Sequence, residues 1–401
     1  MQEESMMKFF RLLVWGLCII IMAPGACTID AEVFGTVTTY AGLAGTSGHI
    51  DGPLAEARFN RPEAMAFDYW DNLLVGDSGN KSIRRIILTG TDAGTVETLW
   101  PRPGQGDLAI QGDIRGLAID SQRNILFTDH HAHQVFLLET DSNGRPTGNV
   151  TTFGSGTLGY RDGPAEAAMF NYPQGISVDS LTDVIYVADT YNNRVRRIDR
   201  MGNVTTFAGS TKDYAEGQGV AAKFKEIVDV AVYRSGETVS IIVSDTWNHC
   251  IRVLDSEGNS GMYAAYQGSW GHKDGGSALA KVGTPQFLFL DAGGSLYFTD
   301  GTIPAIRKVT PGHTVSPQPT PGQPGKVTGP DKIAGRFVST VAGFQGFSSQ
   351  NNFFIGHGYQ DGNNLEARFD TPRGIAVRTQ RNVTHVYVAD VNNHVIRRIA
   401  Y

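Results

Sequence analysis

Short runs of apolar residues alternating with small ones recur along the chain, and an aspartate closes six of them. The runs are LLVGD ending at Asp77, ILFTD at Asp129, IYVAD at Asp189, IIVSD at Asp245, LYFTD at Asp300 and VYVAD at Asp390. Alternating β-branched and aromatic residues predict half-buried β-strands, and a short aspartate side chain can accept hydrogen bonds from the turn that follows. Six similar copies predict a β-sheet repeat protein.

Two further patterns keep a fixed distance from these aspartates. Six residues after each one stands Ile or Val, and the next residue is Phe136 in the second copy and an arginine in the others, namely Arg84, Arg196, Arg252, Arg307 and Arg397. Upstream of the aspartate, five copies share an acidic residue followed by Gly, an apolar residue eight positions after the acidic one, and Pro or Ile three positions further on. The five sets are Asp51, Phe59 and Pro62; Asp162, Phe170 and Pro173; Glu216, Phe224 and Ile227; Asp274, Val282 and Pro285; and Asp361, Phe369 and Pro372. We interpret the repeated Asp and Arg as structural, for turn capping and pairing between units, and the Phe as a core plug between units.

Each unit contains four expected strands, with the innermost following the proline and the second ending at the aspartate. A strand of the fourth type, 37–42, precedes the first unit, whereas the last unit stops after its third strand. Pairing these two segments would close a ring and remove two exposed sheet edges. The sequence therefore predicts an all-β, six-bladed β-propeller over 37–401, closed by an N-terminal strand that completes the C-terminal blade. A Pro-rich stretch at 310–330 interrupts blade five, and we interpret it as a surface loop insertion.

The N-terminus carries the pattern of a signal peptide over residues 1–26. Lys8 and Arg11 precede an apolar run from Leu12 to Ala23, and small residues follow. A basic segment, a short apolar run and small residues are typical of secretory signals. We therefore expect a secreted, extracellular protein with a short lead at 27–36 and no membrane span once the signal is cleaved; the alternative is a retained anchor with the propeller on the extracytoplasmic side.

The secretory route gives two kinds of residue a possible role. The sequons at Asn80, Asn149, Asn203 and Asn382 are candidate glycosylation sites. Outside the signal the cysteines are Cys27 and Cys250, and their spacing does not decide whether they pair.

Composition narrows the classes of partner. Glycine makes up 48 of 401 residues and charged residues 18%, which suits short strands joined by tight turns and argues against a coiled coil or a charged disordered chain. The net charge of −6 offers no basic excess for a phosphate backbone, so we expect no nucleic-acid partner.

The segments YVADTYNNRVRRI (186–198) and FNYPQGISVD (170–179), with Asn-His pairs at 248–249 and 393–394, resemble the NHL repeat. The resemblance covers roughly 37–401 and implies a six-bladed propeller that usually binds proteins or other ligands. In the amidating lyase of this fold, three histidines just before inner strands hold zinc. The matching positions here are Glu63, Arg115, Gln174, Val228, Gln286 and Arg373, so we expect no zinc site, no cofactor and no catalytic residue of that kind.

These positions should ring one mouth of the central channel. Glu63, Arg115, Gln174, Gln286 and Arg373 are the ligand candidates there, with Glu63 and Arg373 placed to form an ion pair across the ring closure. The mouth could be a hydrated, self-neutralised rim, a site where Arg115 and Arg373 hold a small anionic or polar ligand, or a lactonase-like calcium site with few hard oxygen ligands. We interpret the cluster His130, His131 and His133 as a solvated outer turn, because zinc needs three or four convergent ligands.

Two functions remain open. The first is a secreted, non-catalytic binding or scaffold propeller that presents loop faces to an extracellular protein, glycan or matrix partner. The alternative is a lactonase- or lyase-like hydrolase that works through a channel-bound metal. The sequence favours the binding protein, because no assembled reactive constellation accompanies the repeats.

Overall fold

The computed structural model describes residues 35–101, 110–268, 270–311, 335–343, 347–348, 353–354 and 357–401. The predicted signal peptide (1–26), Cys27 and nearly all of the Pro-rich stretch lie outside these residues. The compact unit Phe34–Tyr401 contains the described residues. Among them, no helix has the length and apolar character needed to cross a membrane.

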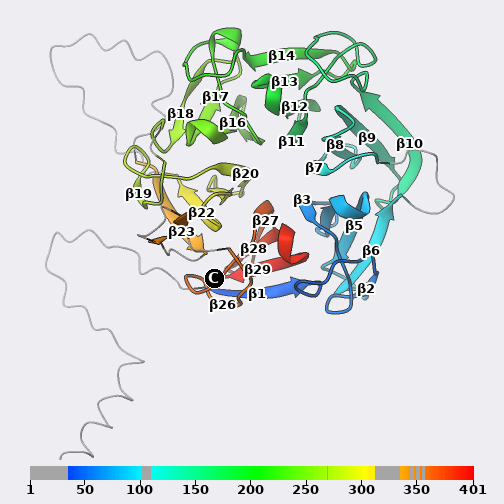
Figure 1. The fold of residues 1–401 in the computed structure, drawn as a ribbon. Coiled ribbons are helices and arrows are strands. Elements are labelled where there is room, and N and C mark those ends of the chain that lie inside the picture. The colour runs from blue at the N-terminus through cyan, green and yellow to red at the C-terminus, as the bar shows by residue number, and fades with distance from the viewer. Residues whose placement is uncertain are drawn as a thin grey trace, which may run out of the picture. The chain divides into compact units, whose positions relative to one another are not determined.

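The described chain forms six sheets, each with four long antiparallel strands, arranged around a central axis (Figure 1). Blade one has β3 (Pro62–Phe67), β4 (Leu73–Asp77), β5 (Ser82–Ile87) and β6 (Thr95–Trp100), with the short β2 (Gly52–Pro53) at its edge. Blade two has β7 (Ile114–Ile119), β8 (Ile125–Asp129), β9 (Gln134–Thr140) and β10 (Pro146–Phe153). Blade three has β11 (Pro173–Asp179), β12 (Val184–Asp189), β13 (Arg194–Ile198) and β14 (Val204–Gly209).

The second half of the ring repeats this order. Blade four has β15 (Val230–Ser235), β16 (Thr238–Asp245), β17 (Cys250–Leu254) and β18 (Ser260–Ala264). Blade five has β20 (Pro285–Leu290), β21 (Leu296–Asp300), β22 (Ala305–Thr310) and β23 (Phe337–Ala342), with β19 (Gly275–Gly276) at its edge. Blade six has β27 (Pro372–Gln380), β28 (Val383–Asp390), β29 (Val395–Ala400) and β1 (Thr36–Ala41), with β26 (Gly362–Asn363) at its edge; β24 (Phe347–Ser348) and β25 (Phe353–Phe354) form a separate pair.

The prediction of an all-β, six-bladed propeller is confirmed. Blade six combines both ends of the described chain, because β1 pairs antiparallel with β29, with Thr36 opposite Ala400 and Val37 opposite Ile399. Neighbouring inner strands contact each other around the whole ring, including β27 with β3.

The repeated aspartates and arginines hold each blade together internally. Asp189 accepts hydrogen bonds from the backbone of Asn171, from Asn192 and from Arg196, and the same Arg196 pairs with Asp162 at 2.7 Å. Asp162 in turn accepts from the backbone of Thr206 in the outer strand of the same blade. The predicted capping of the turn's backbone does not occur in this blade, because Asp189 accepts from the side chain of Asn192 and from the backbone of the preceding loop. The expected pairing between units is also wrong, because each Arg ties the incoming loop to its own blade.

Contacts between blades come from other repeat positions. Phe59 is fully buried and packs beside Gly42 of the preceding blade and under Arg84, whose guanidinium lies 5.2 Å from the ring centre. Thus the Phe plug fills the seam between blades, as predicted.

Four aspartates are followed by short 3₁₀ turns, η1 (Ser78–Asn80), η2 (Thr190–Asn192), η4 (Thr246–Asn248) and η5 (Val391–Asn393), while η3 (Gly219–Ala221) lies in a loop. The residue four positions after the repeated aspartate accepts a hydrogen bond from the next blade in three copies. His133 and His394 accept hydrogen bonds through Nδ1 from the backbone N–H groups of Tyr172 and Arg61, and Asn193 accepts from Glu226 in the same way. We call these contacts the seam bonds. Burial is the largest cause that lowers the pKa of His133 and of His394, so both favour the neutral form that can accept.

Candidate functional site

Interblade loops and 3₁₀ turns lie on one face of the ring, here called the loop face. The backbone of Gly79 in η1 donates to Asn60, that of Tyr191 in η2 donates to Asn171, and that of Trp247 in η4 donates to Lys225. Each of these acceptors lies in the segment that leads into an inner strand, β3, β11 or β15. The starts of the inner strands, and with them the predicted mouth residues, therefore open onto the loop face.

An ion cluster forms at this mouth where blades one, two and six meet. Glu63 is fully buried, and its carboxylate contacts Arg115 Nε at 2.6 Å, Arg61 at 2.8 Å and Arg373 at 3.4 Å. Asp113 contacts Arg115 at 2.8 Å and Arg61 at 3.4 Å. The expected ion pair between Glu63 and Arg373 forms, and Arg61 and Asp113 join it although the sequence analysis did not select them.

Burial sets the electrostatics of this cluster. It raises the pKa of Glu63 to about 7, while Arg115 and Arg61 act in the opposite direction. Burial also acts to raise the pKa of Asp113, but the hydrogen bond from Arg115 and the charges of Arg115 and Arg61 lower it on balance. The two carboxylates are therefore engaged with guanidinium groups, which opposes the binding of a further cation.

The other predicted mouth residues do not join the cluster. The backbone carbonyl of Gln174 accepts from Thr128 Oγ1 at 2.6 Å, and Val228 accepts from the backbone N–H of Gly175 at 2.8 Å. The side-chain Oε1 of Gln286 and the Nε of Arg373 are buried without a hydrogen-bond partner. The structure thus brings together Glu63, Arg115 and Arg373, and leaves Gln174 and Gln286 elsewhere on the rim.

The histidine cluster lies nearer the channel than expected. His130 is buried, its Nδ1 lies 3.3 Å from the carbonyl oxygen of Pro173, and burial with the nearby Arg115 lowers its pKa to about 3. Ser78 and Thr246, at the matching place in blades one and four, likewise bond to a carbonyl of the next inner strand. The interpretation as an outer, solvated turn is wrong for His130, whose role is to join blades.

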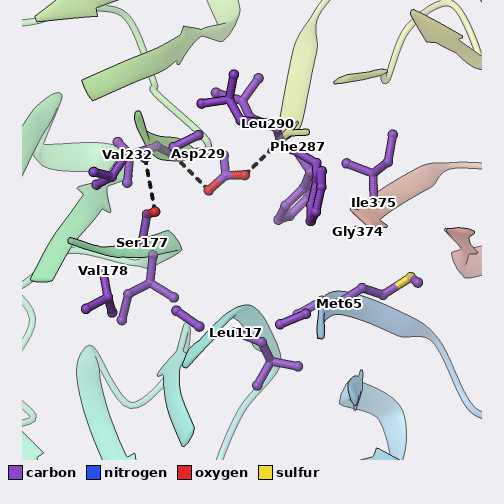
Figure 2. A pocket seen from close by; sticks show the side chains of 18 of the residues that line it. Met65, Leu117, Ser177, Val178, Asp229, Val232, Phe287, Leu290, Gly374 and Ile375 are labelled. Atoms are coloured by element: carbon purple, nitrogen blue, oxygen red, sulfur yellow. Dashed lines mark hydrogen bonds between the residues drawn. The ribbon is translucent and has the colours of Figure 1, made fainter. Parts of the chain in front are cut away.

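Below the mouth, the channel contains one carboxylate that the sequence analysis missed. Asp229 stands where blade five has Phe287 and the other four inner strands have a small residue, namely Ala64, Gly116, Gly175 and Gly374. Its two oxygens accept hydrogen bonds from the backbone N–H groups of Val230 and Leu288, each at 2.8 Å (Figure 2). Alignment of the six copies would have shown this departure, because a side chain here must enter the seam with the next blade.

Gly175 makes room for that carboxylate. A Cβ atom at position 175 would lie 1.7 Å from Asp229 Oδ1, so no other residue fits there without displacing Asp229. Burial raises the pKa of Asp229 to about 7. Within the described residues no arginine, lysine or histidine lies within ion-pair distance of it.

The sequons differ in how available their amide nitrogens are. Nδ2 of Asn80 donates to Gly48 O and to Asp77, both at 2.7 Å, as the turn of blade one requires. Asn203 donates to Asp199 and Asn149 to Glu139. Asn382 is exposed in the hairpin between β27 and β28. Cys250 is a free, fully buried thiol whose pKa burial raises.

Comparison with known proteins agrees with the repeat pattern. Residues 170–198 match the family model described as NHL repeat. NHL repeat-containing protein 2 of Homo sapiens is 32% identical over 103 residues, which cover 25% of this chain and 14% of that protein. The chain is an NHL-repeat β-propeller. This NHL propeller is also 25% identical over 294 residues to Protein SUPPRESSOR OF QUENCHING 1, chloroplastic, of Arabidopsis thaliana, covering 67% of this chain and 26% of the relative.

Solved structures share the fold at low sequence identity. An auxiliary nutrient binding protein from Bacteroides thetaiotaomicron superposes with a TM-score of 0.62 at 18% identity, covering 91% of the NHL propeller and 76% of that chain. One from Bacteroides ovatus gives 0.62 at 17% identity, covering 92% and 77%. At such identity the likeness establishes the fold alone. The NHL propeller spans about a quarter or less of the length of the two curated relatives.

Proposed function

We propose that this NHL propeller is a secreted, non-catalytic binding module that presents its loop face to an extracellular protein, glycan or matrix component. The single observation that carries the proposal is a row of aromatic side chains on that face. They occupy the second position after the repeated aspartate in three consecutive blades, as His131, Tyr191 and Trp247. The matching residues of the other three blades are Gly79, Thr302 and Asn392.

The aromatic row is open to solvent. Tyr191 is 50% and Trp247 48% exposed. Tyr172, just before the inner strand of blade three, lies 5.2 Å from Tyr191 and 5.8 Å from His131 between ring centres, so the row continues across the seam between blades two and three. The repeat does not require aromatic residues here, since three blades lack them.

Exposed aromatic rings are better explained by a role in binding than by a role in stabilising the fold. Tyr and Trp are enriched at the centres of protein interfaces, where a large rigid side chain loses little entropy. Further exposed rings stand in neighbouring loops of the same face, at Tyr160 and Tyr266. The Bacteroides propellers of the same fold are auxiliary nutrient binding proteins, which is compatible with a binding role.

The metal-dependent hydrolase receives no comparable support. Glu63 is the carboxylate among the predicted mouth residues, and three guanidinium groups already surround it. Their positive charge opposes a divalent cation at the mouth. The binding module is therefore the function that the geometry supports best.

A capture experiment tests the proposal. Wild-type protein and the variant Tyr191→Ala/Trp247→Ala are immobilised and incubated with extracellular fraction, and the retained material is compared. Leu181→Ala/Met201→Ala, which removes exposed apolar side chains from hairpins outside the loop face, is the matched control. We expect loss of a saturable partner with the aromatic variant alone, and prior treatment with protease or glycosidase distinguishes protein from glycan. Equal retention by all three proteins would contradict the proposal.

A further inference from the structure

A cavity of about 360 Å³ occupies the centre of the ring. Its walls combine polar groups with apolar side chains from the inner strands of all six blades, Met65, Leu117, Ile176, Val230, Leu288 and Ile375. Figure 2 shows these strands around the open centre, with the Asp229 carboxylate between the inner strands of blades four and five. A cavity that offers apolar side chains together with convergent polar groups is typical of a small-molecule site.

The first polar group of this cavity is the carboxylate of Asp229. Its backbone hydrogen bonds with Val230 and Leu288 satisfy one lone pair on each oxygen but bring no positive charge. A buried carboxylate without a cationic partner is costly, and the raised pKa of Asp229 expresses that cost. A positively charged ligand group beside Asp229 would remove it.

The second polar group is the ion cluster at the mouth. Three guanidinium groups, of Arg61, Arg115 and Arg373, face two carboxylates, so the cluster keeps one positive charge in excess. Arg373 has the longest of the contacts with Glu63, and its Nε is buried without a hydrogen-bond partner. Arg115 lines the cavity, and Arg373 directly precedes Gly374, which also lines it. An anionic group that enters the cavity from the mouth therefore meets the guanidinium of Arg115.

We propose that the channel binds a small zwitterion with an apolar body, its anionic group at Arg373 and Arg115 and its ammonium group at Asp229. One such ligand neutralises both unbalanced charges, whereas an anion or a cation alone neutralises one. The apolar walls contact the carbon chain between the charged ends, and guanidinium groups bind carboxylates with paired hydrogen bonds. This site is separate from the aromatic row on the loop face.

A matched set of probes tests the charge requirement on the wild-type protein. Isothermal titration compares 6-aminohexanoate with hexanoate, hexylammonium and 1-hexanol, which share the carbon chain and differ in charge. The ω-amino acids with four and eight carbons vary the separation of the charges. We expect one zwitterion of the series to bind at least about tenfold more tightly than every singly charged or neutral probe.

Variants then assign each end of the ligand. Asp229→Asn should remove the advantage of the zwitterion over hexanoate, and Arg373→Gln its advantage over hexylammonium. Arg378→Gln removes a guanidinium from the other end of β27, where it pairs with Asp71, and should bind like wild type. Absence of binding for all zwitterions, equal affinity for 1-hexanol, or the same loss in Arg378→Gln would overturn the proposal. Because the probe series needs no variant, a folding defect in Asp229→Asn leaves the proposal testable.

Discussion

Replacing Asp229 by asparagine should change the pH dependence of stability more than stability itself. In the unfolded chain this carboxyl has its ordinary pKa of 3.8, whereas burial raises it to about 7 in the fold. Between these values the folded protein holds a proton that the unfolded chain has released. Wild-type stability therefore falls as the pH rises through this window, and asparagine, which does not titrate, removes that contribution.

The size of the effect follows from the shift. Each pKa unit corresponds to about 1.36 kcal/mol, so the full shift of about three units amounts to about 4 kcal/mol. About two of these units lie between pH 5 and pH 7, which corresponds to about 3 kcal/mol. Asparagine also has a cost that does not vary with pH, because its NH₂ group cannot accept one of the two backbone hydrogen bonds, which costs about 1–3 kcal/mol.

Urea unfolding at pH 5, 6, 7 and 8 measures both terms. We expect Asp229→Asn to gain about 3 kcal/mol relative to wild type from the lowest to the highest pH, with a constant offset from the lost hydrogen bond. Asp92→Asn, at an exposed surface position, removes the same formal charge and serves as the control. A difference between Asp229→Asn and wild type that stays constant with pH would refute the reasoning.

The seams, the blades and the sequons give four further predictions. His394→Asn should keep the seam bond to Arg61, because Asn193 makes the same bond in blade three. The pKa of His394 is lowered in the fold, so its contribution to wild-type stability is complete above about pH 6.5 and is lost as the pH falls, whereas asparagine does not titrate. Wild-type denaturation curves that coincide at pH 5 and pH 7 would contradict this prediction. Arg196→Leu leaves Asp189 buried without its cation and should cost about 3–5 kcal/mol in urea unfolding, against less than about 1 kcal/mol for the exposed Arg200→Ala. Deleting residues 32–44 removes β1 with the buried Val37 and should lower the melting temperature by on the order of 10 °C or cause aggregation, and an unchanged melt would show that closure by β1 is dispensable. In protein from a secretory host, Asn382→Gln should abolish a glycosidase-sensitive mass shift and Asn80→Gln should not, because both Asn80 amide hydrogens are already bound; a shift lost only with Asn80→Gln would reverse that assignment.

The fold could be read from the sequence because its determinants are local and repeated. Asp189, Arg196 and Phe170 recur at fixed spacing, and their contacts lie inside one blade or at its nearest seam. Spacing alone does not say which neighbouring element a long side chain reaches. For that reason the arginines were expected between units, whereas Arg196 in fact pairs with Asp162 of its own blade.

The site was predictable only where symmetry places residues side by side. Glu63 and Arg373 occupy equivalent positions in adjacent blades, so their ion pair follows from ring closure. Arg61 and Asp113 precede the inner strands at a position that varies between copies, and nothing in the repeat indicates that their side chains turn toward the mouth. Asp229 did leave a signal, since it replaces a small residue of the inner strand, but its importance depends on the seam that it enters.

The pairing of β1 with β29 has a consequence for biosynthesis. The ribosome makes β1 first and β29 last, so the opening strand emerges without its neighbour and stays unpaired while the rest of the ring is translated. Until β29 has been made, β1 lacks this hydrogen-bonded neighbour and has an uncovered edge that can pair with other chains. Chaperone protection of the nascent polypeptide should therefore matter most in the interval between the synthesis of β1 and the synthesis of β29.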